Sequence, residues 1–180
     1  MQTMRSIGCR RAVTSSLKRV KHHVFPELIP IKQITVLLAE DHALFRKSLK
    51  ALIELAGDIE VIGEAKNGSE AVDLHAKLHP DIVVMDIAMP LLNGLEATHQ
   101  IMETSSTARV LILSSHADPE YIEQAMASGA SGYLIKQSSA PVLADAIREV
   151  LKGNTYFSLS ISKRLRDECQ TVFDKGRSLK

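Results

Sequence analysis

Side chains that can bind a cation or a phosphoryl group follow directly on short apolar runs in this sequence. Two acids, a third acid, a hydroxyl and an ammonium each follow such a run: Glu40, Asp41, Asp86, Ser114 and Lys136. Three carboxylates that meet repel one another unless a positive charge joins them. Oxygen ligands suit a hard cation such as Mg²⁺, and a lysine and a hydroxyl beside them can contact phosphoryl oxygens. These residue types favour transfer of a phosphoryl group to a carboxylate nucleophile, with the cation and Lys136 offsetting developing negative charge.

Whether these side chains meet depends on the elements that carry them. The apolar runs predict five strands: Ile34–Ala39, Ile59–Ala65, Ile82–Met85, Val110–Leu113 and Tyr133–Ile135. Helical patterns lie between the runs, and this alternation predicts an α/β fold with a doubly wound parallel sheet and helices on both faces. Sites in such sheets lie outside the carboxyl ends of the strands, where the five side chains stand. Residues 59–65 partly alternate, which is typical of an edge strand.

The helical patterns also predict exposure and capping. In the first helix the apolar residues recur on one side, which places four charged residues on the opposite side: Arg46, Lys47, Lys50 and Glu54. Asp118-Pro119 predicts a helix start with Asp118 as N-cap, and Ser139 can cap the last helix. His75 and His79 stand four residues apart in one helix, where a solvated helix face is favoured over a transition-metal site.

Charge is distributed unevenly along the 180 residues. Residues 1–33 carry seven lysines and arginines against one acid, a net charge of +6, whereas residues 34–154 have a net charge of −8 and residues 155–180 one of +3. We expect a basic, disordered N-terminal extension over 1–33, one domain over 34–154 and a linker-like tail over 155–180. The alternatives for the extension are a transit peptide or weak contact with nucleic acid or anionic lipid.

The composition also bears on location. Cys9 and Cys169 are the only cysteines and lie in the two tails, where nothing suggests a disulfide framework. No apolar run approaches the roughly 20 residues that a membrane span needs. With no secretory signal, these features favour the reducing cytoplasm and predict no membrane association.

Four motifs in order carry a resemblance to a known family. They are Val36-Leu-Leu-Ala-Glu-Asp-His42, Val84-Met-Asp-Ile-Ala-Met-Pro90 with Asn93-Gly-Leu-Glu96, Leu111-Ile-Leu-Ser-Ser115 and Gly129-Ala-Ser-Gly-Tyr-Leu-Ile-Lys136. Over residues 34–155 the chain resembles the receiver domain of two-component response regulators, in particular the NarL/FixJ-like branch with LuxR-type output. The separations of 45, 28 and 22 residues between Asp41, Asp86, Ser114 and Lys136 agree with that family.

The resemblance implies a flavodoxin-like, five-stranded sheet of order 2-1-3-4-5. It implies that a sensor histidine kinase phosphorylates Asp86. Glu40, Asp41, Asp86 and the backbone carbonyl of Ala88 would bind Mg²⁺. Ser114 and Lys136 would contact the phosphoryl group, and Tyr133 would change rotamer together with Ser114. The family would make this chain a phosphoacceptor rather than a conventional enzyme, with a homodimer as one outcome of phosphorylation.

Two other classes of phosphate-handling protein fit the sequence less well. An aspartyl-phosphate phosphatase would usually carry a second acid two residues beyond the nucleophile, where this chain has Ala88. A nucleotide-binding protein would need a glycine-rich phosphate loop, and neither common form occurs. About two dozen residues follow Asn154, too few for a helix-turn-helix domain, so we expect no sequence-specific DNA binding by this chain alone. It is expected to be a transcriptional regulator without its DNA-binding domain, or a stand-alone receiver acting through a protein partner.

Overall fold

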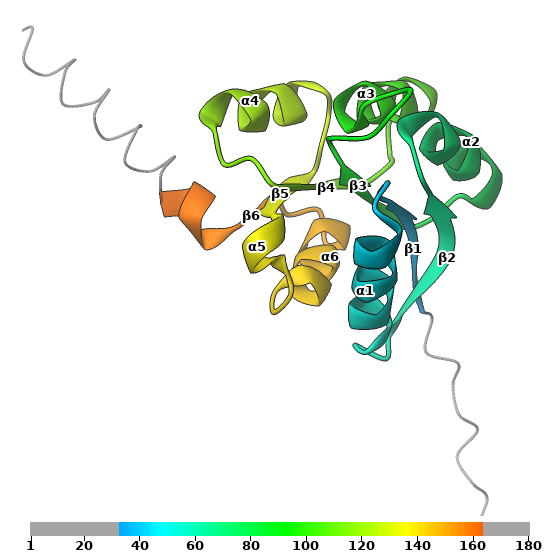
Figure 1. The fold of residues 1–180 in the computed structure, drawn as a ribbon, viewed down its shortest axis with the longest axis horizontal. Helices are drawn as coiled ribbons and strands as arrows, with labels where there is room; N and C mark the ends of the chain where they lie inside the picture. Colours follow the sequence, from blue (N-terminus) through cyan, green and yellow to red (C-terminus); the bar gives the residue numbers. More distant parts are fainter. Residues whose placement is uncertain (1–32, 164–180) are drawn as a thin grey trace, which may run out of the picture. The chain divides into compact units, whose positions relative to one another are not determined.

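A computed structural model describes residues 33–163. The expected disorder of the N-terminal extension, the cysteines at 9 and 169, and the tail from residue 164 onward lie outside this range. The described residues form one parallel sheet of order β2-β1-β3-β4-β5-β6 (Figure 1). The strands are β1 (Ile34–Ala39), β2 (Ile59–Ala65), β3 (Ile82–Asp86), β4 (Val110–Ser114), β5 (Gly132–Ile135) and β6 (Tyr156–Phe157).

The predicted strand order 2-1-3-4-5 is confirmed, and the sheet has one strand more than predicted. β6 pairs in parallel with β5 through Gly132–Tyr156 and Tyr133–Phe157. It lies in the segment that sequence analysis assigned to the tail. Two residues are too few to produce a period-two pattern, so pairing with β5, rather than hydrophobic periodicity, identifies this strand.

Helices separate the strands, as predicted. They are α1 (Ala43–Glu54), α2 (Gly68–Leu78), α3 (Gly94–Thr104), α4 (Pro119–Ala127), α5 (Lys136–Ser139) and α6 (Leu143–Leu151). Helices α2, α3 and α4 cover one face of the sheet, and α1 and α6 cover the other (Figure 1). Residues 159–163, at the end of the described range, are also helical. Among the described residues, no helix is long and apolar enough to cross a bilayer.

The two covered faces explain the continuous apolar runs. In β1, Leu37 and Ala39 belong to the core beneath α2, α3 and α4, whereas Val36 and Leu38 belong to the core beneath α1 and α6. Every residue of β3 is buried. Burying one such aliphatic side chain stabilises a fold by about 1.5–3 kcal/mol. The predicted edge strand β2 does lie at an edge, and Glu60 and Glu64 are its exposed positions.

The structure corrects two expectations at helix ends and faces. Ser139 does not cap the last helix: its hydroxyl donates to the carbonyl of Lys136 at 2.9 Å, and α6 begins after Val142. His75 is not on a solvated face, because it is 7% exposed and burial lowers the pKa of its ring. Asp118 does occupy the N-cap position before Pro119, although its side chain makes no capping hydrogen bond.

Candidate functional site

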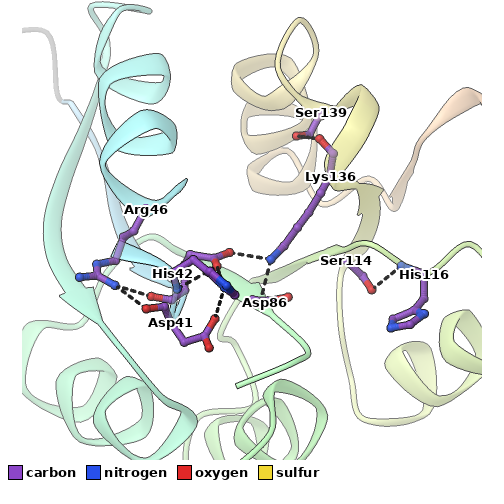
Figure 2. A network of polar contacts seen from close by, with 9 residues as sticks. Asp41, His42, Arg46, Asp86, Ser114, His116, Lys136 and Ser139 are labelled. Atoms are coloured by element: carbon purple, nitrogen blue, oxygen red, sulfur yellow. Dashed lines mark hydrogen bonds and ion pairs between the residues drawn. The ribbon is translucent and has the colours of Figure 1, made fainter. Parts of the chain in front are cut away.

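The carboxyl edge of the sheet brings the five side chains singled out from the sequence to the ends of neighbouring strands (Figure 2). Asp86 is the last residue of β3 and is 3% exposed. The chain turns sharply after it, and the amide of Gly94 donates to the carbonyl of Ile87 at 2.9 Å. A Cβ at Gly94 would lie 1.9 Å from the carbonyl oxygen of Asp86, so only glycine fits where α3 begins.

Lys136 contacts two acids at once. Its Nζ lies 2.8 Å from Oδ2 of Asp86 and 2.7 Å from Oε2 of Glu40, which comes from the end of the neighbouring strand β1 (Figure 2). Burial on its own lowers the pKa of Lys136, but the two carboxylates together outweigh it and the pKa is raised. The ammonium therefore stays charged and bridges β1 and β3 from the end of β5.

Glu40 is 1% exposed, which makes its negative charge costly. Burial raises the pKa of its carboxyl group, the hydrogen bond from Lys136 opposes this, and the charge of Asp86 adds to it. Its other oxygen, Oε1, accepts a hydrogen bond from the amide of His42 at 3.2 Å. Each carboxylate oxygen of Glu40 therefore has a partner, yet the group remains electrostatically disfavoured.

Asp41 and His42 complete a cluster of ligand-type atoms. The Nδ1 atom of His42 lies 3.0 Å from Oδ1 of Asp41 and 3.7 Å from Oε1 of Glu40. Ligand atoms of Glu40, Asp41 and His42 all lie within 4.8 Å of one another, the only such group of three found among the described residues. His42 directly follows the acidic pair in the sequence, and the family resemblance gave it no role. Ala88, whose carbonyl was assigned to the cation, is exposed in the loop after Asp86.

Arg46 is a further residue that the sequence pattern placed wrongly. It was assigned to the solvent side of α1, but it is 8% exposed. Its Nη1 donates to the carbonyl of Glu40 at 2.6 Å and to that of Asp41 at 3.5 Å (Figure 2). Its Nε donates to Oε2 of Glu64 at 3.1 Å. It stands on the first turn of α1, where helical spacing alone does not show that the loop after β1 covers it.

Ser114 and Tyr133 are both connected to His116. The Oγ of Ser114, at the end of β4, accepts a hydrogen bond from the amide of His116 at 3.1 Å, and the hydroxyl of Tyr133 donates to the carbonyl of His116 at 2.9 Å. Tyr133 is fully buried, and burial raises the pKa of its hydroxyl. The His116 ring stacks on that of Tyr121 in α4, with centroids 4.5 Å apart. One loop thus links the end of β4, the core and α4.

A cleft of about 600 Å³ opens beside the acidic cluster. Its wall combines Glu40 and Lys136 with side chains from the start of α1, among them Leu44 and Phe45. Leu44 is 80% exposed, and the Nζ of Lys136 lies 5.0 Å from the centre of the Phe45 ring. A ligand that enters this cleft therefore meets both Lys136 and the buried acid Glu40.

The sheet order and the position of the site define a flavodoxin-like α/β fold, and comparison with known proteins gives the family. The model of the response regulator receiver domain matches residues 36–148, more than half of the chain. The chain therefore belongs to the response regulator receiver domain family of two-component systems.

Relatives and solved structures agree with this assignment. The chain is 44% identical over 120 residues to the transcriptional regulatory protein LiaR of Bacillus subtilis (strain 168), which covers 67% of this chain and 57% of LiaR. It is 34% identical over 149 residues to the transcriptional regulatory protein DegU of Brevibacillus brevis, which covers 83% of this chain and 63% of DegU. The chain thus spans less than two thirds of either relative.

Among solved structures, a LuxR-family two-component response regulator from Aurantimonas sp. SI85-9A1 superposes with a TM-score of 0.73 at 34% identity. That match covers 76% of this chain and 97% of the other. The fold and the family are therefore supported by sequence and by structure.

Proposed function

We propose that this receiver domain accepts a phosphoryl group from a sensor histidine kinase on Asp86, with Mg²⁺ held by the neighbouring acids. The observation that carries the proposal is that one cation, Lys136, contacts both Asp86 and Glu40 at the carboxyl edge. In the transfer, a carboxylate oxygen of Asp86 attacks phosphorus. The bond from phosphorus to the kinase histidine breaks, and its electron pair stays with the histidine nitrogen.

The residues present fit a divalent cation. Glu40, Asp41 and Asp86 offer hard carboxylate oxygens, the donors that Mg²⁺ prefers, and the carbonyl of Ala88 is assigned as a fourth ligand. Two of these acids lie in the cluster of ligand atoms within 4.8 Å. When bound, the cation would supply positive charge against the phosphoryl oxygens. Lys136 would turn from Asp86 towards the phosphoryl group and offset charge on the transferring oxygens.

Ser114 and Tyr133 would report the phosphoryl group to the surface. The Oγ of Ser114 accepts a hydrogen bond from the amide of His116 at 3.1 Å. If the hydroxyl turns to bond a phosphoryl oxygen, this hydrogen bond breaks. His116 also holds the hydroxyl of Tyr133. A shift of this residue would therefore release the tyrosine and change the face around α4 and β5, a population shift between two states.

The output is proposed by analogy with the relatives. LiaR and DegU are described as transcriptional regulatory proteins, and the chain covers 57% and 63% of them. We propose that phosphorylation of this receiver serves transcriptional control, through dimerisation or a partner surface. The domain itself has a net charge of −8 over residues 34–154, which disfavours direct contact with DNA phosphates.

The phosphoacceptor is tested by incubating the protein with acetyl phosphate and Mg²⁺ and measuring a base-labile added phosphoryl group by intact mass. Asp86→Asn should abolish it, because the amide is not a nucleophile here. Asp58→Asn, a matched change at the opposite edge of the sheet, should leave it intact. Equal labelling of Asp86→Asn and the unaltered protein would disprove the assignment. Undiminished labelling in excess chelator would disprove the requirement for a cation.

A further inference from the structure

The buried guanidinium of Arg46 is not explained by the roles assigned above. An arginine at the start of a surface helix normally extends into solvent, but this one is 8% exposed. It lies behind the acidic pair and contacts the backbone of Glu40 and Asp41 rather than their carboxylates. Arg46 therefore occupies none of the carboxylate oxygens of Glu40 and Asp41. Lys136, in contrast, contacts Oε2 of Glu40 directly.

The contacts of Arg46 fix the backbone from which both carboxylates project. The amide of Glu40 still pairs with the sheet, donating to the carbonyl of Ala65 at 3.0 Å. Its carbonyl instead accepts from Nη1 of Arg46 at 2.6 Å. A buried carbonyl without a partner costs about 1–3 kcal/mol, so this hydrogen bond holds the peptide plane that orients both side chains.

The guanidinium is itself held from the neighbouring strand. Its Nε donates to Oε2 of Glu64 in β2 at 3.1 Å, and Lys50 contacts Oε1 of the same carboxylate at 3.2 Å. These bonds, led by that from Lys50, lower the pKa of Glu64, so this carboxylate stays charged. Arg46 thus connects β2, α1 and the loop after β1.

We propose that Arg46 is a positioning residue for the divalent cation, acting by holding the Glu40 and Asp41 peptides so that their carboxylates converge. The inference rests on the proposed function. It predicts that Arg46 acts mainly on cation affinity and much less on the phosphoryl-transfer step once the cation is bound. Groups that orient metal ligands typically contribute about 10–100-fold to affinity.

The test is a titration of the folded protein with Mn²⁺, in which electron paramagnetic resonance measures the affinity for the ion. Arg46→Met keeps the aliphatic stem and removes every donor, and it should weaken Mn²⁺ binding by about tenfold. Arg46→Lys should lose less Mn²⁺ affinity than Arg46→Met. Its single ammonium can bond the Glu40 carbonyl but cannot at the same time bond Glu64 in a fixed geometry. In phosphorylation by acetyl phosphate, Arg46→Met should raise the half-saturating Mg²⁺ concentration about tenfold and change the saturated rate less than about twofold.

Arg148→Met is the matched control. Arg148 also bonds a carboxylate, that of Asp58, through two hydrogen bonds, but at the amino edge of the sheet. Arg148→Met should lower the stability of the protein and leave its Mn²⁺ affinity unchanged. A purely structural role for Arg46 predicts that both variants behave alike, so wild-type Mn²⁺ affinity in folded Arg46→Met overturns the inference.

Three further outcomes are decisive. If Arg46→Met does not fold, Glu64→Gln removes the charge that holds the guanidinium and should weaken Mn²⁺ binding on the order of threefold; unchanged affinity there overturns the inference equally. If the unaltered protein binds no Mn²⁺ at millimolar concentration, the proposed cation site fails, and this inference with it. If it binds Mn²⁺ but Asp86→Asn is still phosphorylated, only the phosphoacceptor assignment fails.

Discussion

The two edges of the sheet place their charged side chains in different surroundings. At the amino edge, Asp58 before β2 pairs with Arg148 of α6 through two bonds of 2.9 and 2.7 Å. At the carboxyl edge, Lys136 is shared between Glu40 and Asp86, and Asp41 is contacted by His42.

The difference lies in how completely the acids of each edge are paired with cations or hydrogen-bond donors. Asp81, also at the amino edge, accepts hydrogen bonds from the amide and the hydroxyl of Thr35 at 2.9 and 2.8 Å, and these bonds join β1 to the start of β3. Such groups have structural partners in the resting fold. At the carboxyl edge Lys136 contacts only two of the three carboxylates, which leaves an excess of negative charge, and an added cation can lower that electrostatic cost.

The largest expected effect comes from removing the shared cation. Lys136→Met should slow phosphorylation by acetyl phosphate roughly 10²–10³-fold at saturating Mg²⁺, because charge on the transferring oxygens loses its ammonium partner. Arg148→Met at the other edge should change the rate less than about twofold. The rates are measured by intact mass against time. A similar slowing in both variants would mean that the two edges do not differ in function.

A glycine at each edge gives the next test. Gly94→Ala should destabilise the protein by about 1–3 kcal/mol, because its Cβ meets the Asp86 carbonyl at 1.9 Å and something must shift. The shift displaces Asp86, so phosphorylation should also slow. Gly57→Ala meets nothing within 4 Å but has a φ of +79°, so it should cost about 1 kcal/mol through backbone strain without slowing phosphorylation. Urea unfolding and the phosphorylation rate measure the two effects.

The smallest effects are in the pH dependence of stability, where the two edges should have opposite signs. Burial raises the pKa of Glu40 above its ordinary 4.5, so the folded state loses stability as pH rises through that raised pKa. In chelator, Glu40→Gln should therefore raise the melting temperature at neutral pH by about 2–4 °C, an advantage that vanishes below pH 4.5.

Asp58 is the opposite case. Its hydrogen bond with Arg148 lowers its pKa below the ordinary 3.8, so its contribution is present above pH 3.8 and is lost as pH falls through the lowered value. Asp58→Asn should lower the melting temperature at neutral pH. The decrease should be smaller than for the loss of a buried ion pair, because the carboxylate of Asp58 is 37% exposed. Shifts of the same sign in the two variants would contradict the contrast between the edges.

The residues that sequence analysis missed share one physical reason. Arg46 sits on α1 at a position that helical periodicity assigns to solvent, yet the loop after β1 and Glu64 of β2 enclose it. Its burial depends on contacts 18 residues apart in sequence, which a local pattern cannot contain. β6 was missed for the same reason, because its pairing with β5 is a long-range contact.

The sequence alone determined the fold and which side chains gather at the carboxyl edge of the sheet. Continuous apolar runs separated by helices require a parallel sheet covered on both faces, and parallel strands necessarily present their carboxyl ends at one edge. Glu40, Asp41, Asp86, Ser114 and Lys136 had to gather there. Only the tertiary structure decided their partners: that Lys136 bridges Glu40 and Asp86, that His116 holds both Ser114 and Tyr133, and that Arg46 supports the acidic pair from behind. Topology fixes which strand ends meet. A hydrogen bond also requires that donor and acceptor atoms are placed to within about an ångström, and the packing of the whole domain sets those positions.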